Sequence, residues 1–342
     1  MTDEAVNYAQ PSFHNLLALN DEELGELDIA YVNLICASGL PGTQNLNIKA
    51  HLDILDRAAE QVEYNTQRCL WFKDRPEKYN YSFNLFRIHV MVSVLQRNFG
   101  VYYNPRCIPE DSTLYPEDVF LHGILGGAGG TCASLPVIYT AVGRRLNYPL
   151  KLVTAPCHLF CRWDDPNGEK FNICASNNSG FDNPDDNHFR TGRYPITPKQ
   201  EKEGRFLVSL SPRQELAEFL GQRGYCWLDL GNYKEAAFSF VRASALDLEN
   251  KLAAAVAANT LDKWHQFLKS QLPPHFPSLD IKLPPRRFPN IPQWVESQFI
   301  GLETLQEVLT KPQYQGWWES LRQFPDARPS NVPRQIGVEL AQ

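Results

Sequence analysis

The sequence GGAGGTCASLP, from Gly126 to Pro136, places Cys132 directly after a glycine-rich run. Glycines allow positive φ angles and close backbone approach, and the threonine before the cysteine is a favourable helix N-cap. The residues that follow recur with helical spacing, namely Leu135, Ile138, Tyr139, Val142 and Leu146. The pattern predicts a helix buried on one face, with Cys132 in its first turn.

The position of Cys132 has a chemical consequence. Near a helix start, unpaired N–H groups and the positive end of the helix dipole favour a thiolate, and the same N–H groups can donate to an oxyanion. The alternative is a small cysteine packed at a tight glycine turn, as many non-catalytic cysteines are. Residues further along the chain favour the reactive interpretation.

Composition limits the classes of partner. Among 342 residues, 33 Lys and Arg face 39 Asp and Glu, and this net charge of −6 argues against nucleic acid or an anionic membrane as the main partner. The N-terminus resembles no signal peptide, and no stretch approaches the roughly 18 apolar residues of a membrane span. Together with scattered cysteines, these features predict a cytoplasmic protein without a disulfide framework.

Neither a metal nor a cofactor is expected. The chain has no C-x-x-C pair, and Cys157 and Cys161 are predicted to project from the strand face opposite to His158, so the group does not converge as zinc ligands must. The glycine run lacks the spacing of a dinucleotide-binding or phosphate-binding loop.

The order of predicted elements indicates an α+β fold. Helical spacing covers residues 50–62 and 83–99, and a short helix begins near Pro116. Alternating residues then predict strands at 150–154, 158–163 and 171–175, with a turn at 164–169 that closes a hairpin. We expect an N-terminal helical region (1–112), a core (113–208), a helical segment (209–270) and a C-terminal arm with helices (271–342).

His158 opens the second predicted strand. A thiol from a helix start and an imidazole from a facing sheet form the arrangement that a papain-type site needs. A lone strand histidine has a structural alternative, since its intermediate burial requires no function. The combination with Cys132 favours a Cys-His pair that meets across the layer.

A third residue should orient the imidazole. If the turn is centred on Pro166 and Asn167, Cys174 lies opposite Phe160 and diagonally from His158 on one face. The orienting group is therefore expected at Cys174. Asn172 lies opposite Arg162, one pair further away, and takes this role only if the turn is longer or bulged.

A loop offers another source of the orienting carboxylate. Asp182 and Asp185 lie in the polar run that follows the third strand. Acidic loops are commonly only solvated, which is the alternative for both residues.

From about residue 116 to 245 the chain resembles the bacterial transglutaminase-like superfamily, in its SirB-like branch. The matching runs are GGTCASLPVIY (129–139), VGRRLNYP (142–149), HLFCRW (158–163) and FNI (171–173). The resemblance implies a papain-like fold in which Cys132 is the nucleophile and His158 the base. Family members usually carry Glu after Phe-Asn-Ile, and here Cys174 takes that place.

The C-terminal part shows two further patterns. Residues 217–243 resemble one tetratricopeptide repeat, which cannot stand alone and must pack on the core. Residues 272–293 are rich in proline and predict an extended arm, anchored by Trp294, Trp317 and Trp318.

Two functions follow. The first is thiol-dependent acyl transfer or hydrolysis of an amide or isopeptide bond through Cys132 and His158, transglutaminase-like or protease-like, on a protein or peptide substrate. The second is a catalytically inactive scaffold that binds a protein partner, motivated by Cys174 in the acid position. Oligomeric state stays open.

Overall fold

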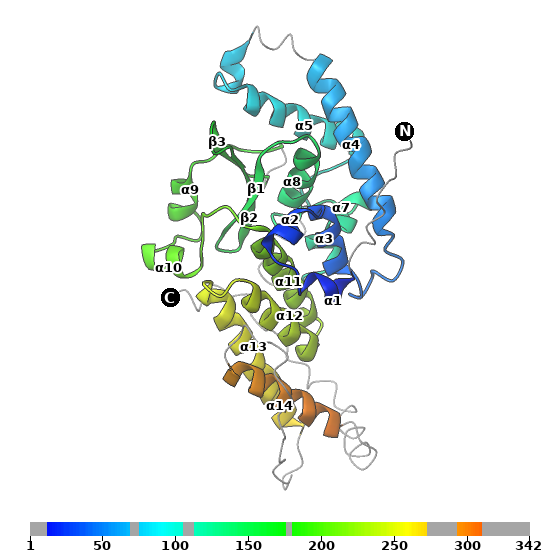
Figure 1. Ribbon diagram of the computed structural model, residues 1–342, viewed down its shortest axis with the longest axis vertical. Coiled ribbons are helices and arrows are strands. Elements are labelled where there is room, and N and C mark those ends of the chain that lie inside the picture. Colours follow the sequence, from blue (N-terminus) through cyan, green and yellow to red (C-terminus); the bar gives the residue numbers. More distant parts are fainter. Residues whose placement is uncertain (1–11, 69–74, 105–112, 176–179, 272–292, 310–342) are drawn as a thin grey trace.

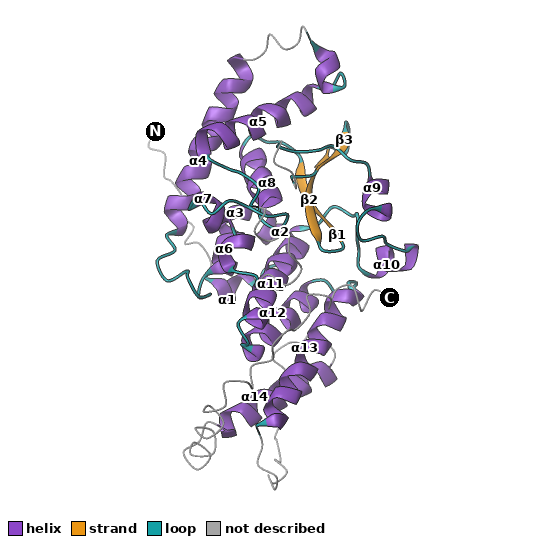
Figure 2. Cartoon of the chain, turned by 180° about the vertical axis from the view of Figure 1, so that it is seen from behind, coloured by secondary structure: helices purple, strands orange, loops and turns teal. Residues whose placement is uncertain are grey.

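The computed structural model describes residues 12–68, 75–104, 113–175, 180–271 and 293–309. Its only sheet within these ranges is antiparallel, in the order β1 (Leu150–Ala155), β2 (His158–Asp164) and β3 (Lys170–Ile173), and helices flank it on both sides (Figures 1 and 2). The expected α+β class with helical flanks is confirmed.

The N-terminal helices precede the sheet. They are α1 (Phe13–Leu16), α2 (Asp21–Gly25), α3 (Ile29–Ala37), α4 (Ile48–Arg68), the 3-10 turn η2 (Pro76–Tyr79) and α5 (Phe83–Phe99). The periodicity at 50–62 and 83–99 correctly predicted α4 and α5, and Gly100 ends α5 with a φ of 64°. Helix α3 was not predicted because eight of its nine residues are buried, which leaves no amphipathic period.

The predicted short helix near Pro116 is two helices, α6 (Pro116–Val119) and α7 (Leu121–Leu125). Between them Phe120 is extended, with φ −114° and ψ 155°. The carbonyl of Asp118, which would continue a regular helix, instead accepts hydrogen bonds from the hydroxyls of Thr131 (2.8 Å) and Ser134 (2.9 Å). The break therefore ties this segment to the turn that carries Cys132.

The two faces of the sheet pack on different partners. One face packs on α8 (Leu135–Arg145) within the main core, through Leu150, Leu152, Leu159, Cys161 and Trp163. The other face forms a smaller apolar cluster that comprises Val153, Ala155, Phe160, Cys174, Phe189 and Leu207. Phe189 belongs to α9 (Asp186–Thr191), which with α10 (Pro198–Glu203) lies on the side of the sheet away from α8 (Figure 1).

Strand pairing follows the predicted register. Arg162 pairs with Asn172, as expected for a turn centred on Pro166 and Asn167. Strand β3 is shorter than predicted, because after Ile173 the backbone of Cys174 exchanges both hydrogen bonds with that of Asp182. At the other end, Ala155 pairs with His158, which leaves a two-residue turn between β1 and β2.

The remaining helices are α11 (Pro212–Asp229), α12 (Tyr233–Leu246), α13 (Lys251–Ser270) and α14 (Gln293–Leu309). Helices α12 to α14 extend away from the sheet around a separate core that includes Phe240, Trp264 and Phe299 (Figure 1). Arg144 joins α8 to α11 through a bidentate ion pair with Glu215 (2.5 and 2.9 Å).

Part of the C-terminal expectation stays a prediction. The proline-rich residues 272–292, Trp317, Trp318 and the side chain of Trp294 lie outside the described residues. None of the described helices combines the length and the apolar character needed to cross a membrane.

Candidate functional site

The turn that carries Cys132 is held by side-chain caps. The hydroxyl of Thr131 accepts the N–H of Ala133 (3.1 Å), and the hydroxyl of Ser134 accepts the N–H of Thr131 (3.0 Å). Leu135 donates its N–H to the carbonyl of Thr131 (3.0 Å). Thr131 therefore caps as predicted, but regular helix α8 begins at Leu135, so Cys132 lies in the helical turn that leads into it.

The glycines let this turn pack against a neighbouring segment. Gly129 has a φ of 79°, and a Cβ there would lie 2.7 Å from the ring of Tyr102. Gly130 donates to the carbonyl of Tyr102 (2.9 Å) and accepts from the N–H of Asn104 (2.7 Å). A Cβ on Gly130 would also lie 2.7 Å from Leu135 Cγ, so any larger residue would displace the start of α8.

The thiol of Cys132 is half-buried and reaches the end of the sheet. Its Sγ lies 3.9 Å from the carbonyl oxygen of Cys157, an exposed residue in the turn between β1 and β2 with a φ of 54°. Cys157 directly precedes His158 in the chain. The structure thus brings Cys132 to the hairpin end, beside the backbone that carries the histidine.

The face of the sheet that packs on α8 does not carry His158. Cys161 is on that face, where its thiol donates to the carbonyl of Pro136 (2.9 Å). Burial raises the pKa of Cys161 to about 12, so this cysteine is a packed, protonated residue. Cys132 therefore comes near the histidine at the turn that precedes β2, and the pairing of its thiol with the imidazole stays a prediction.

His158 lies on the opposite face, among aromatic rings. Its ring stacks on those of Phe160 and Phe189, with centroids 6.3 Å and 5.7 Å apart. Its Nε2 lies 3.3 Å from Sγ of Cys174, the contact predicted from the register. Burial, assisted by the charge of His188, lowers the pKa of His158 to about 4, so the imidazole is neutral at physiological pH.

Asn172 belongs to a separate buried network. Its Oδ1 accepts from Nε of Arg162 (2.7 Å), and its Nδ2 donates to Asp186 (2.8 Å) and to the carbonyl of Pro184 (3.0 Å). The hairpin is not bulged in the way that would move Asn172 toward His158.

The two loop aspartates, Asp185 and Asp182, make different contacts. Asp185 caps α9 by accepting the N–H of His188 (3.0 Å). The backbone of Asp182 pairs with that of Cys174 through the two hydrogen bonds described above, and an orienting role for its carboxylate stays a prediction.

Two residues near the site were missed by sequence reasoning. Arg162 shares its strand face with His158, and this parity was available from the alternation of β2. Phe189 had no comparable signal, because a single aromatic residue after an acidic loop gives no period.

Other features lie away from Cys132. A pocket of about 280 Å³ opens between α2, α8, β1 and α11, and its lining includes Arg144, Lys151 and Glu215. Across the described ranges, no three His, Cys, Asp or Glu side chains are grouped as metal ligands.

Comparison with known proteins gives one match. Searches among curated proteins and among solved structures each found no match. A scan against protein families matches residues 49–220, half of the chain, to the Transglutaminase-like superfamily. This span runs from α4 into α11 and includes the Cys132 turn, the whole sheet and α9. The chain therefore belongs to the transglutaminase-like superfamily.

Proposed function

We propose that this protein catalyses thiol-dependent acyl transfer or hydrolysis of an amide or isopeptide bond, with Cys132 as the nucleophile and His158 as the base. The observation that carries the proposal is the position of the Cys132 thiol, 3.9 Å from the carbonyl of the residue that precedes His158. Family membership supports the same assignment, because the match spans both residues.

Cys132 and His158 together supply the nucleophile and the proton carrier that the reaction needs. His158 takes the proton of the Cys132 thiol while the sulfur forms a bond to the substrate carbonyl carbon. Backbone N–H groups of the helical turn stabilise the oxyanion, and the C–N bond then breaks as His158 returns the proton to the leaving amine. Water or a second amine attacks the thioester and regenerates the thiol.

Cys174 is the proposed orienting group. Its sulfur lies 3.3 Å from Nε2 of His158, which leaves Nδ1 as the ring nitrogen for the thiol of Cys132. A thiol is a weaker hydrogen-bond acceptor than a carboxylate and brings no charge when protonated. This arrangement supports a slow enzyme rather than a fast one.

A second function is favoured by the same residue. With Cys174 in place of an acid and the pKa of His158 held at about 4, the fold fits a catalytically inactive scaffold that binds a partner protein. The scaffold hypothesis predicts that Cys132→Ala leaves the cellular phenotype unchanged.

Finer assignments are part of the proposal. The sequence motifs support the SirB-like branch, and the antiparallel pair α11 and α12 supports a tetratricopeptide-like unit that binds a protein or peptide. The acidic net charge supports a partner other than nucleic acid or a membrane, and the cysteine usage supports a cytoplasmic location.

The test is alkylation of the full chain with iodoacetamide, followed by peptide mapping to identify the labelled cysteine. We expect Cys132 to react fastest, and His158→Gln to slow that reaction. Cys161→Ala is the matched control, because it removes a packed thiol on the other face of the sheet. Labelling of Cys132 at the rate of a free thiol, with no effect of His158→Gln, would favour the scaffold.

A further inference from the structure

We propose that Arg162, Asn172 and Asp186 are positioning residues, which hold α9 against the sheet so that Phe189 covers His158 and controls how readily the imidazole takes up a proton. This inference deepens the function proposed above and rests on it only for the role of His158 as the base.

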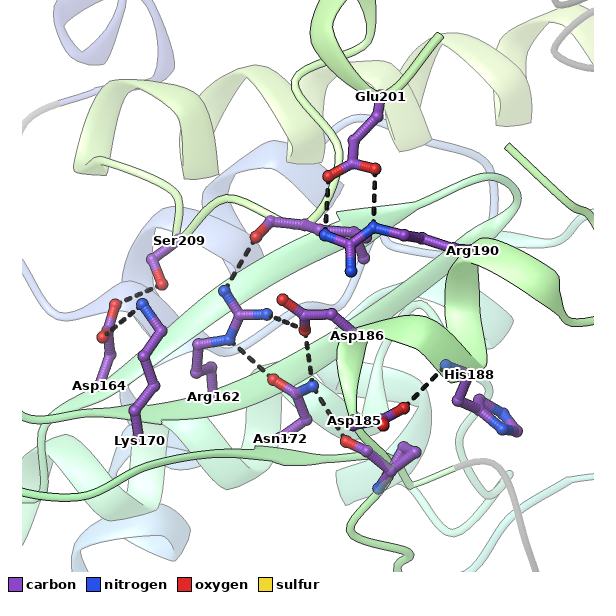
Figure 3. Close-up of polar contacts among 12 residues, drawn as sticks. Arg162, Asp164, Lys170, Asn172, Asp185, Asp186, His188, Arg190, Glu201 and Ser209 are labelled. Carbon is purple, nitrogen blue, oxygen red and sulfur yellow. Dashed lines mark hydrogen bonds and ion pairs between the residues drawn. The ribbon is translucent and has the colours of Figure 1, made fainter. Parts of the chain in front are cut away.

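Arg162 lies at the centre of a polar network that joins the sheet to α9 (Figure 3). The guanidinium of Arg162, nearly fully buried, donates to Asn172 (2.7 Å), to Asp186 (2.5 Å) and to the carbonyl of Leu207 (2.9 Å). Asn172 donates to the same Asp186 oxygen (2.8 Å), so one carboxylate joins β2 and β3 to α9. A buried cation needs such partners, because an unpaired charge in the interior is strongly unfavourable.

The placement of α9 depends on this network. Isolated helices shorter than about 12 residues are marginal in water, and α9 spans six. Its placement must therefore come from tertiary contacts. Its contacts with the sheet include the hydrogen bonds of the Asp186 carboxylate and the ring of Phe189, which stacks on Phe160 at a centroid distance of 4.2 Å.

Phe189 links α9 to His158. Phe189 is buried, and its ring lies 5.7 Å from the imidazole at an angle of 27°. Movement of α9 away from β2 would admit water to the imidazole and remove the largest cause of its reduced basicity, which is burial.

The groups around His158 come from four elements. His188 acts on it from α9, Cys174 contacts it from the end of β3, Cys157 precedes it in the turn, and the Cys132 thiol approaches from the start of α8. Of these, His188 contributes a charge that lowers the pKa of His158. Measurements on a His188→Gln background remove this coupling.

The direction in which the pKa of His158 changes distinguishes a positioning role of Asp186 from a purely electrostatic one. Asp186→Asn removes a negative charge, and by Coulomb's law alone this change lowers the pKa of a nearby histidine. Release of α9 acts in the opposite direction, because a solvated imidazole regains its ordinary pKa of about 6.5. A rise therefore identifies the positioning role.

The experiment measures the pKa of His158 by NMR titration of its ring, assigned with His158→Gln, in the full chain. We expect Asp186→Asn and Phe189→Ala each to raise it by about one unit or more toward the ordinary value. Glu201→Gln is the matched control. It breaks the Arg190–Glu201 pair between α9 and α10 (2.9 Å for both bonds) without touching Arg162 (Figure 3), and we expect no shift.

An unchanged or lowered pKa of His158 in either Asp186→Asn or Phe189→Ala overturns the proposal. If Asp186→Asn fails to fold, Asn172→Ala, which removes another partner of the Asp186 carboxylate, takes its place with the same expected rise. The titration requires no activity, so its outcome is distinguishable from that of the proposed function. If Cys132 is unreactive but the pKa of His158 rises in the variants, the proposed enzymatic function is wrong and the positioning role stands.

Discussion

Cys174→Asp should convert the weak histidine into a stronger base. The Cys174 sulfur lies 3.3 Å from Nε2 of His158, so a carboxylate at this position can accept the N–H of the ring. Its negative charge stabilises the imidazolium, and the pKa of His158 therefore rises.

The size of the rise can be worked out from the geometry. Two unit charges about 4 Å apart attract by about 4 kcal/mol at an effective dielectric constant of about 20, and each pKa unit corresponds to about 1.36 kcal/mol. The upper limit is thus about three units. Cys174 is buried, so the new carboxylate loses part of this energy to its own desolvation, and we expect a rise of about one to two units from the present value of about 4.

The assay combines NMR titration of His158 with the alkylation rate of Cys132. A rise of one unit in the base makes proton transfer from the thiol about tenfold more favourable, so alkylation at neutral pH should accelerate by about that factor. Cys174→Asn is the matched control, because it has nearly the same shape and no charge. Equal His158 pKa values in folded Cys174→Asp and Cys174→Asn proteins would refute the reasoning.

Three further predictions concern stability. The pKa of His158 is lowered to about 4 in the folded chain, so as pH falls below about 6.5 the unfolded chain binds a proton that the folded chain does not. Stability should therefore decline toward pH 4, and His158→Gln should reduce that decline by about 3 kcal/mol in urea unfolding. Gly143→Ala places a Cβ 2.3 Å from Leu150 Cδ1 and should lower the free energy of unfolding by about 1–3 kcal/mol. Gly221→Ala, with open space around it in α11, should raise the free energy of unfolding by about 0.5–1 kcal/mol. Denaturant titration of both variants checks this contrast. Thr131→Val removes two hydrogen bonds of the turn and should lower the unfolding free energy by about 1–3 kcal/mol while slowing Cys132 alkylation; unchanged alkylation would mean that the cap does not shape the thiol.

Features with strong local signals were predictable. The Asn-Gly turn after Pro166 determined the β2–β3 register, and with it the contact between His158 and Cys174. Helical spacing after Leu135 predicted α8, although the four residues before it, Thr131 to Ser134, form a turn whose two hydroxyls donate to the carbonyl of Asp118. Such long-range hydrogen bonds leave no periodic trace.

The surroundings of the histidine were not predictable from local pattern. Helix α9 is too short to be recognised by period, and its place depends on a buried ion pair between Arg162 and Asp186, 24 positions apart in the chain. The exact approach of Cys132 was also hidden, because alternation assigns His158 to a face without saying which face meets α8.

The side chain and the backbone of Cys174 have separate roles. The side chain contacts His158, and the backbone pairs with Asp182. Both of its main-chain hydrogen bonds go to the backbone of Asp182, so any residue except proline can keep them. A substitution at this position would change the pKa of His158 and leave the strand pairing as it is. One substitution at Cys174 therefore changes the group beside the histidine without removing a strand hydrogen bond.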